Sequence, residues 1–428
     1  MTYEKTLEYI HSVCWKGSRP GLERTRELLG MMGNPQEKLK YIHVAGTNGK
    51  GSVCSMLSSV LIECGYKTGL YTSPFVRFFN ERMSIDNKMI SNDELSEITE
   101  YVKQFADKME DCPTEFELIT AIGFEYFYRN NCDIVVLETG MGGRLDSTNI
   151  ISTNILSVIT GIALDHTVFL GNTISEIATE KAGIIKPDRP VVFGGDDREA
   201  IETIENIAKE QNSKLIVCSK ADIKNVEHTL EGCTVDTDEY SNLFVSLVGD
   251  YQPSNILTAL KCISVLKEEG YNIPEVSLRR GMEKVYWPAR FEIINKDPLM
   301  IYDGAHNPQG LRACVDSIKR FFKDTRVNIL SGVMKDKDVE QMLPVIAEVA
   351  NEVFTVTPDN PRSMDSKEYA EYFNNYGIKA YSYDSIDKGV ASALEKSKQS
   401  GCALVALGSL YMYGDVCDAL ENIKKMTE

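Results

Sequence analysis

The sequence predicts an α/β protein built from two doubly wound domains. Short β-branched runs alternate with longer amphipathic stretches, which is typical of parallel sheets covered by helices. The alternation starts near residue 41, gives way to another pattern over 221–248, and resumes after residue 288. A chain of 428 residues is long enough for two or three domains with separate cores. We therefore expect a larger domain over residues 1–287 and a smaller one over 288–428.

The first domain is predicted to start its sheet with the strand Tyr41-Ile-His-Val-Ala45, followed by a helix over residues 50–64. Further strands are expected at the other short apolar runs, and helices at the amphipathic stretches between them. Thr173 stands where it can cap one of these helices. The expected strands are 67–71, 133–138, 154–159, 191–194 and 214–218, and the expected helices are 93–109, 115–129, 173–182, 198–211 and 252–269.

Two segments interrupt this pattern. From 221 to 248 the period falls to two, with many Thr, Val and Asp residues, which predicts a small antiparallel patch. The segment Val285-Tyr-Trp-Pro-Ala289 places a proline beside two large aromatic residues, and we interpret it as a hinge between the domains. After the hinge, helical stretches separate strands that are expected near 300–303, 326–330, 352–356, 379–381 and 403–407.

Composition excludes several classes of function. With 63 acidic and 46 basic side chains, the formal charge of −17 repels phosphate backbones and argues against nucleic-acid binding. The longest apolar runs are far shorter than the ~20 residues of a membrane span, and the N-terminus lacks a leader pattern. Eleven cysteines without a Cys-x-x-Cys pair favour reduced thiols over a disulfide framework or zinc site. We expect a cytoplasmic protein, and no long apolar surface stripe requires a partner, so we expect a monomer.

A glycine-rich loop lies between the first predicted strand and its helix. In Gly46-Thr-Asn-Gly-Lys-Gly-Ser52 the glycines allow backbone N–H groups to point at phosphate oxygens, next to a helix N-terminus. Lys50 supplies a mobile charge and Ser52 a hydroxyl. Gly51 separates these two residues, so the spacing differs from the common phosphate-loop form. The alternative is a turn that binds nothing, but a lysine and a serine add little to a mere turn, so nucleotide binding is favoured.

This loop, extended to Ile42, resembles that of the folylpolyglutamate synthase and dihydrofolate synthase family, which belongs to the Mur-ligase-like ATP-dependent amide ligases. Further matching segments occur in the family's order across nearly the whole chain. They are Tyr71–Phe75, Phe79–Arg82, Thr114–Glu117, Glu138–Asn149, Leu164–His166, Glu180–Ile184, Trp287–Glu292, Asp303–Asn307, Lys335–Asp338 and Gly408–Tyr411. One such motif is suggestive, whereas ten in order are highly specific.

The resemblance implies a phosphate-loop-containing, Mur-ligase-like ATP-binding domain and a smaller C-terminal Rossmann-like domain, with the active site between them. It also implies a reaction, the addition of L-glutamate to the γ-carboxylate of a folate with cleavage of ATP to ADP and phosphate. Because a carboxylate is a poor acyl donor, ATP first converts it to an acyl phosphate, which the glutamate amine attacks. Such transfer needs divalent cations, and the resemblance implies two Mg²⁺ ions.

The resemblance also assigns roles to single residues, which we take as expectations. Glu138 ends an apolar strand at the edge where parallel sheets bind ligands. The alternatives for the magnesium residues are a strand-terminal carboxylate, a turn cap and a core imidazole. The implied magnesium residues are Ser73, Glu138 and His166, and the implied ATP residues are Thr47, Asn48, Gly49, Lys50, Gly51, Ser52, Asn255, Arg290 and Asp303.

Lys50, Lys181 and His306 are the expected catalytic residues. In the family, the lysine that matches Lys181 is carboxylated on its side-chain nitrogen, whereas periodicity alone indicates an ordinary Glu–Lys pair. The resemblance places His306, Asp303 and Ser409 near the incoming glutamate or the nucleotide, with turn capping as the alternative. The implied folate-side residues are Thr114, Glu115, Phe116, Glu117, Leu145, Asp146 and Ser147.

Several functions remain open at this point. A bifunctional enzyme that also acts on dihydropteroate is one, although Phe75 stands where many bifunctional members have histidine. A cell-wall ligase is less compatible, because those enzymes usually carry a further N-terminal domain and the phosphate loop already starts at residue 46. A phosphate-loop ATPase switch is expected to lack the Glu138, His166 and Lys181 set. An inactive nucleotide-binding regulator would have been suggested by the loss of Lys50, Glu138 or His166.

Overall fold

The protein is described here from a computed structural model that covers residues 1–13, 19–323 and 325–427. These residues form an eight-stranded sheet, a three-stranded sheet and a six-stranded sheet, with helices between the strands. The predicted α/β class is confirmed. The first sheet uses strands that lie before residue 218 and the third uses strands that lie after residue 291, so no strand is shared. The domain boundary at 287/288 stays a prediction.

The eight-stranded sheet has the order β4-β3-β2-β5-β1-β6-β7-β8. Its strands are parallel from β2 to β8, and β3 and β4 add an antiparallel edge. The central strands are completely buried, as expected for a parallel sheet covered on both faces. The bounds are β1 Tyr41–Ala45, β2 Thr68–Tyr71, β3 Met83–Ile85, β4 Lys88–Met89, β5 Ile134–Glu138, β6 Asn154–Ile159, β7 Val191–Phe193 and β8 Leu215–Val217.

Helices cover both faces of this sheet, because successive residues of a strand point to opposite sides. On one face Ile42 and Val44 pack with α3, α9 and α10, and on the other Tyr41 packs with α4 and α5. The helices up to residue 284 are α1 Tyr3–Ser12, α2 Glu23–Met31, α3 Lys50–Glu63, α4 Asn92–Ala106, α5 Glu115–Arg129, α6 Thr167–Leu170, α7 Ile174–Ala182, α8 Arg198–Glu210, α9 Gln252–Glu268 and α10 Glu275–Lys284.

The antiparallel patch predicted over 221–248 is the sheet β11-β10-β9, with β9 Ile223–Thr229, β10 Gly232–Thr237 and β11 Leu243–Val245. The six-stranded sheet has the order β12-β13-β17-β14-β15-β16 and is parallel except for β12. Its elements are β12 Glu292–Lys296, β13 Leu299–Tyr302, α11 Pro308–Phe322, β14 Val327–Ser331, α12 Val339–Ala347, β15 Ala350–Thr355, α13 Ser366–Asn375, β16 Ala380–Ser382, α14 Ile386–Ser400, β17 Leu404–Leu407 and α15 Tyr413–Thr427.

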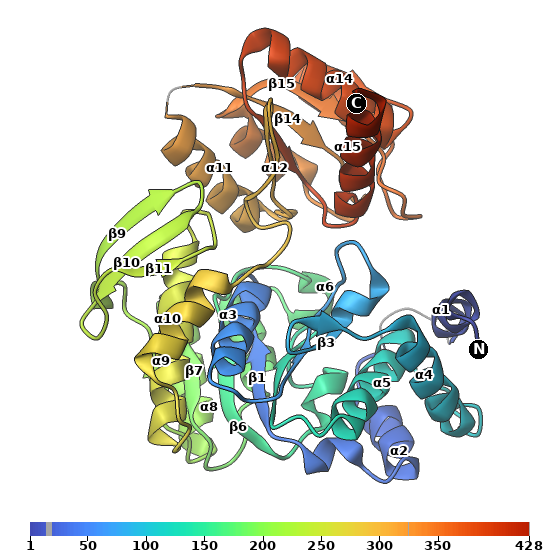
Figure 1. The fold of residues 1–428 in the computed structure, drawn as a ribbon, viewed down its shortest axis with the longest axis vertical. Helices are drawn as coiled ribbons and strands as arrows, with labels where there is room; N and C mark the ends of the chain where they lie inside the picture. The colour runs from blue at the N-terminus through green and yellow to red at the C-terminus, as the bar shows by residue number, and fades with distance from the viewer. Residues whose placement is uncertain (14–18, 324, 428) are drawn as a thin grey trace.

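Figure 1 shows the six-stranded sheet and its helices, in orange to red, above the larger unit. Contacts join the two units directly. Arg77 donates to Asp418 (2.6 Å) and Glu421 (2.9 Å) on α15, and the Tyr251 hydroxyl donates to Asp303 (2.8 Å). These bonds join the two units, and residues that follow β1, β5 and β6 lie close to residues of the second unit, since both line one cavity.

The elements that the sequence did not predict include the helices α1, α2 and α10 and the strands β3, β4 and β12. Strand β4 has two residues and is exposed, and β3 has three, which is too short for a recognisable alternation. Strand β12 is half-buried along the edge of its sheet, and no strand was expected over its residues. Elsewhere the expected and observed bounds agree closely, as for α5, which spans Glu115–Arg129 as predicted.

The described cysteines are all free thiols and most are buried, which agrees with the expected reduced state. Cys14 lies outside the described residues. Within the described ranges, no helix is both long enough and apolar enough to cross a bilayer.

Candidate active site

The loops that follow β1, β5 and β6 leave the same edge of the eight-stranded sheet. The pairing register of these strands determines where each loop begins. Val44 pairs with Glu138 and Ala45 with Ile159, so the ends of β1, β5 and β6 lie level with one another. In doubly wound sheets this carboxyl edge is where ligands bind. The loop after β1 is the glycine-rich segment, and Glu138 is the last residue of β5.

The glycine-rich loop is closely packed against both sides of the site. Gly49 has φ +86°, and a Cβ there would lie 2.4 Å from Oδ1 of Asn255; one on Gly51 would lie 2.6 Å from the Trp287 ring. The Thr160 hydroxyl donates to the Asn48 carbonyl (2.7 Å) and fixes the loop from behind. Glycine at these two positions therefore lets Asn255 and Trp287 pack against the loop backbone, in addition to allowing the turn. This packing fixes the loop backbone before a ligand binds.

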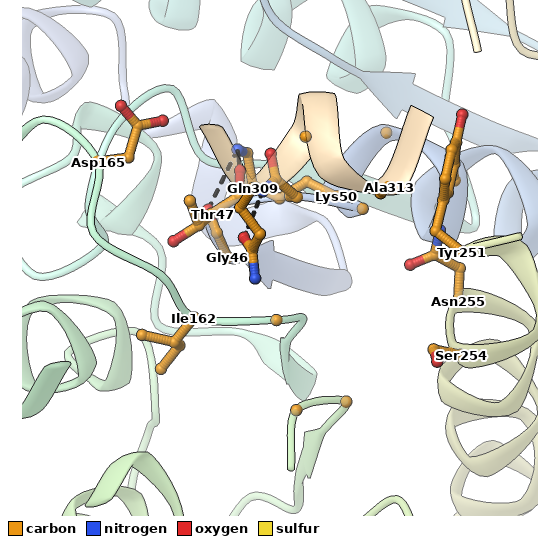
Figure 2. A pocket seen from close by; sticks show the side chains of 18 of the residues that line it. Gly46, Thr47, Lys50, Ile162, Asp165, Tyr251, Ser254, Asn255, Gln309 and Ala313 are labelled. Carbon is orange, nitrogen blue, oxygen red and sulfur yellow. Dashed lines mark hydrogen bonds between the residues drawn. The ribbon is translucent and has the colours of Figure 1, made fainter. Parts of the chain in front are cut away.

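A cavity of about 400 Å³ opens over this loop and is lined from both units of the molecule. Figure 2 shows Thr47 and Lys50 on one side, Asn255 and Tyr251 of the α9 region opposite, and Gln309 of α11 nearby. All the residues predicted for ATP line it, as do the predicted magnesium residues and the three predicted catalytic residues. Those residues are Thr47, Asn48, Gly49, Lys50, Gly51, Ser52, Asn255, Arg290, Asp303, Ser73, Glu138, His166, Lys181 and His306.

Glu138 is a buried carboxylate at the base of the cavity, 4% exposed. The backbone N–H of Ser73 donates to one of its oxygens (3.2 Å), and Lys50 Nζ lies 4.0 Å from the other. Burial raises the pKa of Glu138, while the neighbouring Lys50 acts in the opposite direction. The carboxylate is thus placed where a cation can share it.

The donor set fits a magnesium ion that completes its coordination with substrate oxygens. Glu138, Ser73 and His166 all line the cavity, although the described residues contain no group of three or more His, Cys, Asp or Glu side chains around one point. Magnesium usually takes one or two protein carboxylates together with water and phosphate oxygens. Partial burial lowers the pKa of His166, against the attraction of Asp165, which favours the neutral imidazole that can bind a metal.

Lys181 is a buried lysine, 3% exposed, on α7. Its Nζ donates to the Gly46 carbonyl (2.9 Å), to which Lys50 Nζ also donates (3.2 Å). Burial lowers the pKa of Lys181 to about 7, and the nearby Lys50 charge lowers it further. The helical Glu–Lys pair that periodicity indicates is not formed, because Glu180 pairs with Arg144 instead (2.7 Å).

The second unit contributes Asp303 and His306 from the turn that follows β13. Asp303 accepts hydrogen bonds from the Tyr251 hydroxyl (2.8 Å), Phe291 N (3.0 Å) and Ala305 N (2.9 Å). His306 Nδ1 lies 2.8 Å from the Gly304 carbonyl, so Nδ1 carries the proton and Nε2 the lone pair. Burial lowers the pKa of His306 to about 4, with Lys337 as the next contribution.

The residues expected on the folate side lie next to the cavity without lining it. Thr114 and Glu117 form the capping box of α5, and Glu117 also pairs with Arg24 (2.8 Å). The Phe116 ring packs over Gly140. The remaining members are Glu115, which contacts His11; Leu145, which is exposed; Asp146, which accepts from the backbone of Met141 and Thr148; and Ser147, which is buried. Ser409, which was expected near the glutamate or the nucleotide, is also buried and is not among the residues that line the cavity.

Sequence reasoning missed several groups at the junction of the two units. Tyr251 was assigned no role from the sequence, yet its hydroxyl donates to Asp303. Asn48 donates to Gln309 (2.6 Å), and Asn307 donates to Asp165 (3.1 Å). Asn307 and Asp165 stand inside motifs that the sequence did single out, but pairs separated by more than 100 residues leave no local pattern in one sequence.

Two protein-family models match most of the chain. Residues 44–263 match the Mur ligase middle domain, and residues 289–410 match the Mur ligase glutamate ligase domain. The two matched regions correspond to the eight-stranded and six-stranded sheets and their helices. The segment between them contains Trp287, the residue that packs on Gly51.

Whole-chain relatives agree with these models. The chain is 34% identical to dihydrofolate synthase/folylpolyglutamate synthase of Bacillus subtilis over 97% of its length and 98% of the relative. It is 35% identical to folylpolyglutamate synthase of Lacticaseibacillus casei over 98% of its length and 99% of the relative. Mycobacterium tuberculosis folylpolyglutamate synthase complexed with ADP and AMPPCP superposes with a TM-score of 0.89 at 27% identity, covering 98% of each chain. This protein belongs to the folylpolyglutamate synthase and dihydrofolate synthase family of Mur-type ligases.

Proposed function

We propose that this protein is a folylpolyglutamate synthase, which ligates L-glutamate to the γ-carboxylate of tetrahydrofolate and cleaves ATP to ADP and phosphate. The observation that carries the proposal is the two-sided cavity, which joins a phosphate loop and a buried carboxylate on one unit to Asp303 and His306 on the other. Full-length similarity to folylpolyglutamate synthases supports the same substrates.

In the proposed reaction, a γ-carboxylate oxygen of folate attacks the terminal phosphorus of ATP, and the bond to the bridging oxygen of ADP breaks. The glutamate amine then attacks the acyl carbon, phosphate leaves, and the amine loses a proton. Lys50 and the loop N–H groups hold the phosphoryl oxygens in both steps. Glu138, Ser73 and His166 would hold magnesium, which supplies positive charge to the phosphate oxygens when bound.

His306 and Asp303 are proposed to serve the incoming glutamate and the nucleotide. Because Nδ1 of His306 is committed to the Gly304 carbonyl, its Nε2 is available to accept a hydrogen bond from the amine. Asp303 is already held by three donors and is fixed in orientation. Arg290 donates to the Ala289 carbonyl (2.9 Å), which leaves other guanidinium N–H groups for the nucleotide. Ser409 positions the neighbouring backbone, since its Oγ accepts from Tyr411 N (3.1 Å).

We also propose that Lys181 is carboxylated in the working enzyme. Its lowered pKa provides a neutral amine near pH 7, and such an amine can attack carbon dioxide, lose a proton to water and become a carbamate anion. The anion replaces a cation beside Lys50, where positive charge is disfavoured. Carbon-13 NMR after addition of labelled bicarbonate should show a carbamate signal that is absent from Lys181→Arg. Fully active, bicarbonate-equilibrated enzyme without that signal would remove the modification.

The principal test is ATP-dependent incorporation of labelled glutamate, run in parallel with tetrahydrofolate and with dihydropteroate. Incorporation with tetrahydrofolate is expected. Incorporation with neither acceptor, from folded protein that binds ATP, would refute the proposed function. Incorporation with dihydropteroate as well would identify a bifunctional enzyme, which is the second candidate because the Bacillus subtilis relative carries both names.

The partners in this proposal are small molecules: folate, L-glutamate and ATP. We propose that the enzyme works as a monomer in the cytoplasm. Sedimentation equilibrium at micromolar concentration should return the mass of one chain, 47.9 kDa. A dimer mass would contradict the monomer, and fractionation of cells with an antibody would test the compartment.

A further inference from the structure

Arg82 is a partly buried cation whose guanidinium forms no hydrogen bond or ion pair with any of the described residues. Its Nε is buried without a hydrogen-bond acceptor, and the guanidinium lies between two phenyl rings, 5.2 Å from the centre of Phe75 and 5.5 Å from that of Phe79. The carboxylates of Glu115 and Glu138 act on its charge, but neither forms an ion pair with it. Since arginine stays protonated in proteins, this is a partly buried charge that has no paired anion.

The contrast with Arg24 shows what a structural arginine looks like in the same unit. Arg24 is 9% exposed, and its guanidinium donates twice to Glu117, at 3.0 and 2.8 Å. Such a bidentate pair compensates the charge for its loss of water. Arg82 is less buried than Arg24 and lacks such a pair, so no ion pair within the fold accounts for a cation at this position.

The segment that carries Arg82 is rigid, and the neighbouring carboxylate, that of Glu81, already accepts hydrogen bonds from the backbone. The Glu81 carboxylate accepts the backbone N–H groups of Val76, Arg77 and Phe78, at 2.8, 3.2 and 2.9 Å. Glu81 therefore closes the loop on itself and does not neutralise Arg82. A site that is rigid before its ligand arrives loses little entropy on binding.

Arg82 lies beside the cavity, on the side of the larger unit. Its carbonyl accepts from Thr72 N (3.0 Å), and Thr72 is followed by Ser73 and Pro74, which line the cavity. The partly exposed Phe75 ring offers a flat apolar surface next to one positive charge, while the Phe79 ring is buried behind it in the core. That combination suits a ligand with an aromatic body and a carboxylate end.

We propose that Arg82 binds the α-carboxylate of the terminal glutamate of the folate acceptor and so positions its γ-carboxylate for phosphorylation. This inference rests on the proposed function, since it names a contact within that reaction. The incoming glutamate is the less suitable source of the carboxylate, because Asp303 and His306 lie on the opposite unit. Dihydropteroate has a single carboxylate, the one that reacts, and gives Arg82 no second carboxylate to bind.

The test pairs Arg82→Met with a tetrahydrofolate analogue whose α-carboxylate is an α-carboxamide. The wild-type enzyme should lose about a hundredfold in kcat/KM when the carboxylate becomes an amide, which is the usual scale for breaking a buried charge pair. Arg82→Met should lose a similar factor with tetrahydrofolate and should no longer distinguish acid from amide. KM for L-glutamate should stay within about twofold of the wild-type value.

Thermal melting without ligands provides a readout that does not depend on activity. Removal of the unpaired, partly buried Arg82 charge should leave the melting temperature unchanged or raise it, whereas the control Arg24→Met should lower it by leaving Glu117 unpaired. Arg82→Lys keeps the positive charge but lacks the planar guanidinium that can bind both oxygens of a carboxylate. It should therefore recover part of the preference for the α-carboxylate over the α-carboxamide.

Each outcome separates the alternatives. Wild-type enzyme without activity on tetrahydrofolate refutes the proposed function rather than the role of Arg82. Active wild-type enzyme with an unchanged acid-to-amide ratio in Arg82→Met overturns the role. A rise confined to KM for L-glutamate assigns Arg82 to the incoming amino acid and overturns the acceptor contact. An Arg82→Met protein that melts early or does not fold makes Arg82 a structural residue and also overturns it.

Discussion

Lys50 and Lys181 share one acceptor, the Gly46 carbonyl, so two ammonium groups approach each other at the floor of the site. A phosphate placed on the loop relieves this repulsion for Lys50. We expect Lys50→Ala to lower kcat about a hundredfold to a thousandfold, because it removes a charge that stabilises the transferring phosphoryl group. Melting temperature should change little, since Lys50 donates only to loop carbonyls. A sharp loss of stability with unchanged activity per folded molecule would make the loop structural.

The lowered pKa of Lys181 predicts how the free energy of unfolding depends on pH. Its pKa is about 7 in the folded protein and 10.5 as the ordinary value, so between these pH values the unfolded chain binds the additional proton. Stability from this group therefore rises with pH from about 7 to 10.5 and is lowest below 7, where a charged amine is buried. In CO₂-free buffer Lys181→Met should be more stable than wild type at pH 6, with the difference shrinking by pH 10. Parallel denaturation curves across that range would contradict the lowered pKa.

At the scale of elements, the most predictable part of the site was the local unit formed by β1, the glycine-rich loop and α3. Its signals are adjacent in the chain: a short apolar run, glycines, and a helix start. Residues far apart gave no such signal. The bond from Tyr251 to Asp303 crosses two units, and the isolation of Arg82 is visible only once its neighbours are placed.

Helix α5 shows how one motif can carry two explanations. The motif Thr114–Glu117 was expected to contact folate, and in the structure it caps α5 and pairs with Arg24. We expect Thr114→Ala to cost about 1 kcal/mol of unfolding free energy as a lost cap. Glu117→Ala should cost about 3–5 kcal/mol, because it leaves Arg24 buried without a partner. Urea denaturation measures both, and equal small losses would show that the pair contributes nothing.

For the whole molecule, the reaction requires both units, because the cavity takes its lining from each. Arg77 crosses the junction to Asp418 and Glu421, and Asp250 meets Arg320 and His228 there. The Arg77 contacts join a segment next to Ser73 to α15, and the contact between Asp250 and Arg320 reaches α11. Charge on both sides of the junction makes the closed arrangement sensitive to ionic strength.

We expect the two units to close over ATP and folate. Small-angle scattering should give a smaller radius of gyration with nucleotide and folate than without ligands. Arg77→Ala should raise KM for ATP and folate together, since it weakens closure without touching either binding site. Identical scattering profiles at proven saturation would indicate a cavity that is already assembled before the ligands bind.

Trp287 stands between the two matched family regions and packs its indole on Gly51, at the start of the helix that follows the phosphate loop. The chain has two tryptophans, and the other, Trp15, lies outside the described residues. In a Trp15→Phe protein, the fluorescence would come from one indole lying against the phosphate loop, with a buried N–H that has no acceptor among the residues that the structure describes. Nucleotide entry should therefore change the emission intensity or wavelength, and the time course of that change would report loop occupancy directly. The enzyme thus contains its own optical probe for the order in which ATP and folate arrive.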